Sequence, residues 1–119
     1  MAQITVYGIP NCDTVKRART WLDAHGLAYA FHDFKKAGVP LPGLDGWLGA
    51  VGWEVLLNRK GTTWRKLDDA QREAAHDAAS ARALMLAQPS VIKRPVVQWA
   101  DGLITVGFDA ADWAQRVKG

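Results

Sequence analysis

The chain has 119 residues, 49% of which are hydrophobic, and its charges are spread along the sequence. These features fit one compact domain with an apolar core. With 15 Lys and Arg against 12 Asp and Glu, the net charge of +3 is too even to indicate a nucleic-acid-binding surface. The first residues lack a signal-peptide pattern, and no apolar run approaches the roughly 18 residues of a membrane helix. We therefore expect a soluble, cytoplasmic protein.

The cysteine and histidine content limits the chemistry that the chain can carry out. Cys12 is the only cysteine, which excludes an internal disulfide and a cysteine-rich zinc site. The three histidines, His25, His32 and His76, do not have the spacing of metal ligands, and we predict no metal site. Any covalent chemistry at Cys12 needs an outside partner to resolve the product.

The N-terminal part of the sequence predicts a strand, a helix and a second strand. Residues 3–7 are rich in β-forming residues and are followed by turn residues at 8–11. From Asp13 the hydrophobic residues recur with helical period until Gly26. Residues 27–34 are aromatic and roughly alternating, and the helix-length crossover makes this second strand parallel to the first. The segment predicts a βαβ unit.

The middle of the chain is predicted to be mainly helical. We expect a loop over 35–43, a short helix over 44–51 and a polar loop over 57–64. Asp68 can cap a helix over 69–79, and a further helical stretch over 81–86 stops before a proline.

The C-terminal part predicts a β-hairpin and a helix. Residues 96–99 and 103–106 flank an Asp-Gly pair that readily forms a tight turn. Asp109 can cap a last helix that runs to residue 117. The Arg94-Pro95 bond lies at the entrance of the hairpin and is a candidate for the cis form.

Cys12 lies where the first loop becomes the first helix. A cysteine at a helix N-terminus points its sulfur at unpaired backbone N–H groups and at the positive end of the helix dipole, and both favour the thiolate. Lys16, one helical turn further on, is expected to add to this effect. The alternative is a buried, unreactive cysteine, because free cysteines are among the most buried residues. The Gly-Ile-Pro-Asn loop before Cys12 favours the nucleophile.

Three segments resemble the ArsC/Spx/YffB family of arsenate-reductase-like proteins. They are Y-G-I-P-N-C-D-T-V-K-R-A-R-T-W-L at residues 7–22, L-L-N-R-K-G-T-T-W-R-K-L at 56–67 and I-K-R-P-V-V at 92–97. A fourth, V-G-F at 106–108, is most similar to the Spx and YffB branches. The segments follow in the family's order over nearly the whole chain, and we place the chain closest to the YffB branch.

The resemblance implies an α/β fold with a thioredoxin-like mixed sheet. Its expected parts are the βαβ unit, the β-hairpin and the C-terminal helix. A single domain over residues 1–119 is expected, with a helical insertion at about 40–90.

The resemblance also implies roles for individual residues. Cys12 matches the family's nucleophile, and Arg94 matches an oxyanion-binding arginine before a cis proline. Asn11 is expected to orient the loop or to donate a hydrogen bond. Arg94 is also open to interpretation as an ordinary surface cation, since basic residues are usually solvated.

The loop cation and a third arginine match the family less well. When the loop motif is aligned from Leu56-Leu57 without a gap, the loop arginine of arsenate reductases falls at Asn58. Arg59, one position later, is therefore a candidate for this role, and Lys60 is another. On composition alone, both are ordinary surface charges. The third arginine falls near Gly107, which has no side chain, and this argues against arsenate as the substrate.

The resemblance to the YffB branch implies glutathione-dependent thiol chemistry, and together with the features of the sequence it predicts a glutathione-dependent monothiol reductase. Cys12 attacks a disulfide or an oxyanion, Arg94 and Arg59 stabilise its negative charge, and glutathione acts as co-substrate without a bound cofactor. The expected partners are glutathione and a small-molecule or protein substrate, with glutaredoxin as a further candidate, and the protein is expected to be a monomer. The alternatives are a Spx-like regulatory module that binds RNA polymerase, and an arsenate reductase. Val15 replaces the second cysteine of the Cys-x-x-Cys motif found in many Spx proteins, so a switch by internal disulfide is excluded.

Overall fold

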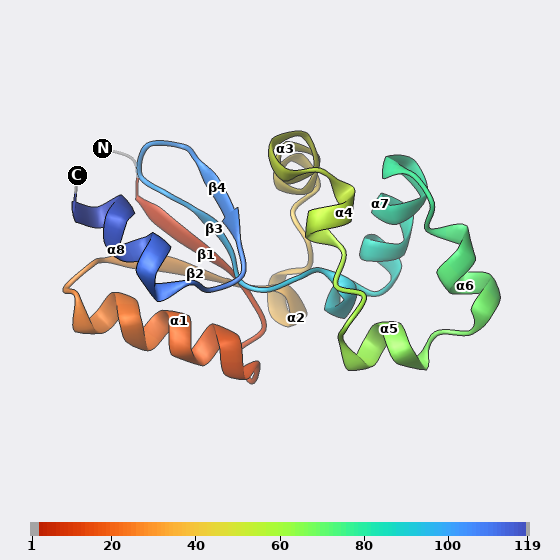
Figure 1. Cartoon of the computed structure of the whole chain (residues 1–119), viewed down its shortest axis with the longest axis horizontal. Helices are drawn as coiled ribbons and strands as arrows, with labels where there is room; N and C mark the ends of the chain where they lie inside the picture. Colours follow the sequence, from red (N-terminus) through yellow and green to blue (C-terminus); the bar gives the residue numbers. More distant parts are fainter. Residues whose placement is uncertain (1–2, 119) are drawn as a thin grey trace. The chain divides into compact units, whose positions relative to one another are not determined.

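The computed structural model describes residues 3–118, and its contacts divide the chain into two compact units. The first unit combines the N-terminal segment up to Asp33 with the C-terminal segment from Arg94, and the second is Phe34–Lys93. Figure 1 shows the elements of both units. Among the described residues, no helix is long and apolar enough to cross a membrane. That the chain is one domain with a helical insertion stays a prediction.

The first unit contains a four-stranded mixed sheet with the strand order β2-β1-β3-β4. Its strands are β1 (Ile4–Gly8), β2 (Tyr29–Asp33), β3 (Val96–Gln98) and β4 (Ile104–Val106). β1 is parallel to β2, whereas β3 is antiparallel to both β1 and β4. The helix α1 (Asp13–Ala24) connects β1 to β2, and α8 (Ala110–Lys118) follows β4. This order of βαβ unit, hairpin and helix confirms the predicted thioredoxin-like α/β fold.

One face of the sheet carries the core of the first unit. The core consists of the buried residues Ile4, Val6, Ala18, Leu22, Val97, Trp99 and Trp113. They come from the strands and from α1 and α8, which therefore pack on the same face (Figure 1). Trp113 is 1% exposed, and the rings of Trp21 and Phe108 meet it edge-on, with centroid distances of 5.6 and 4.8 Å.

The predicted hairpin and last helix are confirmed. Gly102 has φ +89°, and the Leu103 amide donates a hydrogen bond to Asp101 Oδ1 at 3.0 Å. The Asp112 amide donates to Asp109 Oδ1 at 3.1 Å at the start of α8. The Arg94-Pro95 peptide bond is cis, as the sequence indicated.

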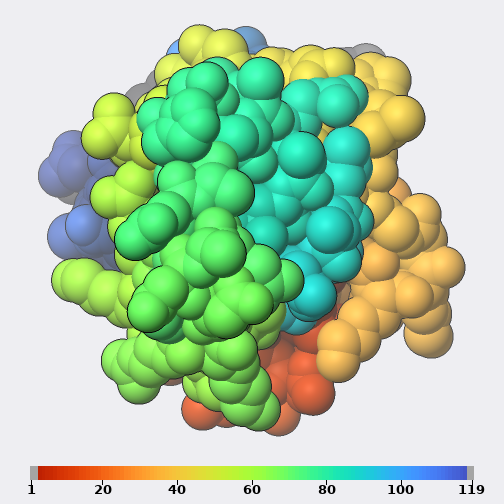
Figure 2. Space-filling model, turned by 90° about the vertical axis from the view of Figure 1, so that its right-hand side faces the viewer, coloured from red at the N-terminus to blue at the C-terminus, as the bar shows by residue number. Residues whose placement is uncertain are grey.

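The second unit is helical. Its elements are α2 (Phe34–Ala37), α3 (Leu41–Val51), α4 (Trp53–Leu56), α5 (Thr62–Lys66), α6 (Asp69–Ala74), α7 (Ala78–Ala87) and the 3-10 turn η1 (Pro89–Val91). Arg82 of α7 donates to Asp45 of α3 at 2.6 Å. In the space-filling view, the side chains of α6 and α7 form one continuous surface of this unit (Figure 2).

Parts of the predicted loops are helical. α2 and the first turn of α3 lie in the segment 35–43, and α5 begins inside the segment 57–64. These pieces are short, and isolated helices of this length are unstable in water. Burial of Phe34 against Trp47, whose ring centroids lie 6.0 Å apart, provides tertiary stabilisation that the local sequence does not reveal.

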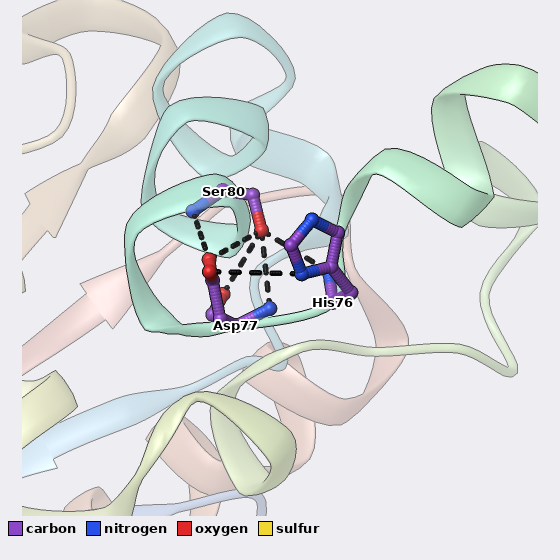
Figure 3. A network of polar contacts seen from close by, with 3 residues as sticks. All are labelled: His76, Asp77 and Ser80. Carbon is purple, nitrogen blue, oxygen red and sulfur yellow. Dashed lines mark hydrogen bonds and ion pairs between the residues drawn. The ribbon is translucent and has the colours of Figure 1, made fainter.

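The prediction of one helix over residues 69–79 is wrong, because the chain leaves the helix after Ala74 and starts α7 at Ala78. Asp77 caps the new helix. It accepts hydrogen bonds from the Ser80 amide at 2.8 Å and from the Ser80 hydroxyl at 2.7 Å (Figure 3). The Asp-x-x-Ser spacing was the available signal for this second start.

Candidate functional site

Cys12 is the N-cap residue of α1. Its backbone is extended, with φ −82° and ψ 126°, and its amide donates to the Ile9 carbonyl at 3.2 Å. The thiol is free and half-buried, and it makes no capping hydrogen bond. The N-cap side chain therefore leaves the first-turn N–H groups of α1 available to an anion formed at the sulfur or on a substrate. The exposed carboxylate of Asp13 in the same turn disfavours an anion at this place, because like charges repel.

The loop that positions Cys12 packs closely against α1. A Cβ atom on Gly8 would lie 2.9 Å from Cγ2 of Val15, which is fully buried. Ile9 of the same loop is only 5% exposed, so its burial also holds the loop in place. Glycine at position 8 therefore permits a close approach of backbone to helix, and this approach fixes where the thiol lies.

Arg94 lies at the same end of the sheet as the Cys12 loop. β3 runs antiparallel to β1 with Tyr7 opposite Val96, so extending this register by two residues brings Arg94 opposite Ile9. Arg94 is half-buried, and its Nε atom is buried. The register therefore puts Arg94 beside the loop that leads to Cys12, and its role as an anion-binding residue stays a prediction.

Gly107, near which the resemblance puts the third arginine of arsenate reductases, has φ +85°. Its amide donates to the Pro95 carbonyl at 2.9 Å, so the position lies beside the cis proline. An arginine here would be strained in this left-handed conformation. Asn11 is exposed in the turn directly before Cys12, where it is accessible to a substrate.

Arg59 and Lys60 belong to the second unit, where both are exposed. The Arg59 guanidinium lies 5.3 Å from the centroid of the Trp53 ring. The loop is held by Asn58, whose side-chain oxygen accepts from the Lys60 amide at 3.1 Å. A role for either cation at Cys12 stays a prediction from the resemblance.

The sequence analysis missed a pair of polar rings at the carboxyl end of the parallel strands. Tyr7 lies opposite His32, and their ring centroids are 5.3 Å apart. Burial raises the pKa of the Tyr7 hydroxyl, and a hydrogen bond with the Thr5 side chain offsets part of this rise. The alternation of buried residues in β1 was the available signal, because it puts Tyr7 on the face opposite Val6. The residues described contain no group of His, Cys, Asp and Glu that could hold a metal ion.

Known proteins match this chain over nearly its whole length. The ArsC family model matches residues 7–116. An uncharacterized protein of Haemophilus influenzae is 40% identical over 110 residues, which are 92% of this chain and 95% of that one.

Two solved structures are similar over nearly their whole length. A protein named YffB is 51% identical, with a TM-score of 0.88 and coverage of 95% of this chain and 97% of that one. An arsenate reductase (ArsC) related protein from Brucella melitensis is 54% identical, with a TM-score of 0.75 and coverage of 98% and 96%. The family model and these relatives span the loop of Cys12, the cis proline and both units, and the chain belongs to the ArsC family.

Proposed function

We propose that the protein is a glutathione-dependent monothiol reductase with Cys12 as its nucleophile. The observation that carries this proposal is the place of Cys12 at the N-terminus of α1, where the thiol is partly exposed and caps no backbone group. The ArsC membership and the name of the Brucella melitensis relative support reductase chemistry at this thiol.

The reaction begins with thiol–disulfide exchange. The Cys12 thiolate attacks one sulfur of a disulfide substrate, the S–S bond breaks, and the other sulfur leaves as a thiolate that takes a proton from water. A glutathione thiolate then attacks Cys12 Sγ and releases the second substrate thiol. A second glutathione removes the first as glutathione disulfide and restores the Cys12 thiolate. One substrate disulfide is thus reduced to two thiols while two glutathione molecules are oxidised.

Arg94 is proposed to bind an anionic group of the substrate or a carboxylate of glutathione. A guanidinium offers two parallel N–H donors to a carboxylate, which a lysine cannot do. The register that brings Arg94 opposite Ile9, three residues before Cys12, supports this role. Asn11 is proposed to donate a further hydrogen bond to the same substrate.

Disulfides are favoured over arsenate as substrates. A compact dianionic oxyanion needs several converging cations, and position 107 provides none because its backbone conformation favours glycine. We expect arsenate turnover with glutathione and glutaredoxin to be far below about 1 per second, the low end of typical enzyme rates.

The test is steady-state reduction of 2-hydroxyethyl disulfide by glutathione. Wild-type protein is expected to turn over, whereas Cys12→Ser is expected to be inactive with an unchanged circular dichroism spectrum. Thr62→Ser, which makes an equally small change at an exposed position, serves as the matched control. Equal rates in Cys12→Ser and wild type would overturn the proposal.

A further inference from the structure

A groove runs along α1 on the first unit. Its volume is about 550 Å³, and it is lined by Lys16, Arg17, Thr20, Trp21, Ala24, Phe108 and Ala110. The floor is apolar and rigid, because Trp21 and Phe108 both pack edge-on against the buried ring of Trp113. The groove lies open to solvent on the outside of α1 and the start of α8.

The groove contains two cations whose side chains have no partner within the described residues, as is also the case for Arg65 and Lys66 outside the groove. Arg19, Arg72, Arg82 and Arg116 each donate from the side chain to a carboxylate, carbonyl or tyrosine oxygen. Over the described range 3–118, the side chains of Lys16 and Arg17 have no such partner. Two unpaired cations beside an apolar floor are complementary to a segment that presents a carboxylate next to an apolar side chain.

Helix geometry connects this groove to the thiol. Lys16, Thr20 and Ala24 follow Cys12 in steps of four residues. These groove residues therefore lie on the same face of α1 as Cys12. A rise of about 1.5 Å per residue puts Arg17 about 7.5 Å and Trp21 about 13.5 Å along the axis from Cys12. An extended chain advances about 3.3 Å per residue and covers these distances in about two and four residues.

We propose that the groove binds a protein substrate through the extended segment around its oxidised cysteine. This inference rests on the proposed function of Cys12. The segment carries an acidic residue about two positions, and an aromatic or large aliphatic residue about four positions, from the cysteine that Cys12 attacks. The open shape of the groove favours such a segment over a small molecule, because small-molecule sites enclose most of their ligand.

The test uses peptides whose cysteine carries thionitrobenzoate in a mixed disulfide. Attack of Cys12 on the peptide sulfur forms a new disulfide and releases coloured thionitrobenzoate, which reports the rate. The peptides are Cys-Ala-Glu-Ala-Phe, its reversed sequence, and versions with Lys in place of Glu or Ala in place of Phe. The same rate is measured with a small reagent, the mixed disulfide of 2-mercaptoethanol and thionitrobenzoate, which has the same leaving group as the peptides but no peptide segment.

With wild-type protein, either Cys-Ala-Glu-Ala-Phe or its reversed sequence is expected to react roughly three- to tenfold faster than the versions of that peptide with Lys in place of Glu or Ala in place of Phe. Arg17→Glu is expected to remove or reverse the preference for Glu without changing the rate with the small reagent. Lys66→Glu, which reverses an exposed charge on the second unit, is expected to keep the preference.

The outcomes separate this inference from the proposed function. Loss of reaction with the small reagent would refute the nucleophile itself. Normal reaction with the small reagent and equal rates for all peptides would overturn the docking groove alone. The reaction of the Glu/Phe peptide is also measured with two competitors, phenylpropionate and the same peptide with Ser in place of Cys. Equally strong inhibition by both would make a small carboxylate the occupant. A dimer that Arg17→Glu dissociates would assign the groove to a second copy of the chain. Either of these last two results would also overturn the inference.

Discussion

Replacing Gly8 by alanine is expected to displace the Cys12 loop. The added Cβ would lie 2.9 Å from Val15 Cγ2, whereas carbon atoms in favourable contact lie about 3.5–4.0 Å apart. Val15 cannot easily yield, because its side chain is fully buried and valine is stiff about χ1. Overpacking of this kind costs about 1–3 kcal/mol, and we expect Gly8→Ala to lower the free energy of unfolding by that amount.

A double-mutant cycle with Val15→Ala measures this contact. Val15→Ala alone removes two buried methyl groups and should lower the free energy of unfolding by about 1.5–2.5 kcal/mol. In the double variant the new Cβ fills part of the space left by Val15, so the total loss should be at least about 1 kcal/mol smaller than the sum of the single losses. Urea unfolding followed by tryptophan fluorescence gives the free energies, and alkylation of Cys12 reports the loop. Strict additivity, or a Gly8→Ala protein as stable as wild type, would refute the close approach.

The remaining predictions concern the arginine, a helical glycine and the α7 cap. Arg94→Ala should lower kcat/KM for glutathione-dependent reduction by roughly ten- to a hundredfold, the equivalent of one charge-assisted hydrogen bond at about 1.5–3 kcal/mol, and Arg94→Lys should recover only part of it; equal losses in both variants would confirm the need for the fork, whereas full recovery in Arg94→Lys would show that charge alone matters, and no loss in Arg94→Ala would make Arg94 a surface cation. Gly46→Ala should raise the free energy of unfolding by up to about 1 kcal/mol, because Gly46 lies inside α3 with no atom within 4 Å of its added Cβ, and a lower value in urea unfolding would contradict this. The pKa of Asp77 is lowered first by the hydrogen bond from the Ser80 amide, so its ionised form stabilises the fold above the ordinary carboxyl pKa and this contribution is lost as the pH falls through the lowered value. The stability difference between wild type and Asp77→Asn should therefore shrink in acid, and a difference that stays constant from pH 7 to about pH 2 would show that the cap does not depend on charge.

The sequence predicted the first unit better than the second. In the first unit each element had a local signal, such as the Asp-Gly pair of the hairpin and the Asp109 cap. The helices of the second unit are short and depend on tertiary contacts such as that between Phe34 and Trp47. Propensity summed over a few residues cannot reveal such helices.

Two structural features of the candidate site were predictable from the sequence, but its packing was not. The sequence identified Cys12 at a helix start and Arg94 before a cis proline, and the structure has both features. It could not reveal the contact between Gly8 and Val15 or the ring pair of Tyr7 and His32. Both depend on strand pairing and side-chain packing, which join residues that show no relation in the sequence.

We expect the fold to make Cys12 a better nucleophile than a cysteine in an unfolded chain. Because Cys12 is the only cysteine, the rate of iodoacetamide alkylation can be compared directly between folded protein and protein unfolded in urea at the same neutral pH. Stabilisation of the thiolate by the first turn of α1 predicts alkylation about tenfold faster in the folded state. A folded protein that reacts more slowly than the unfolded chain would contradict this expectation.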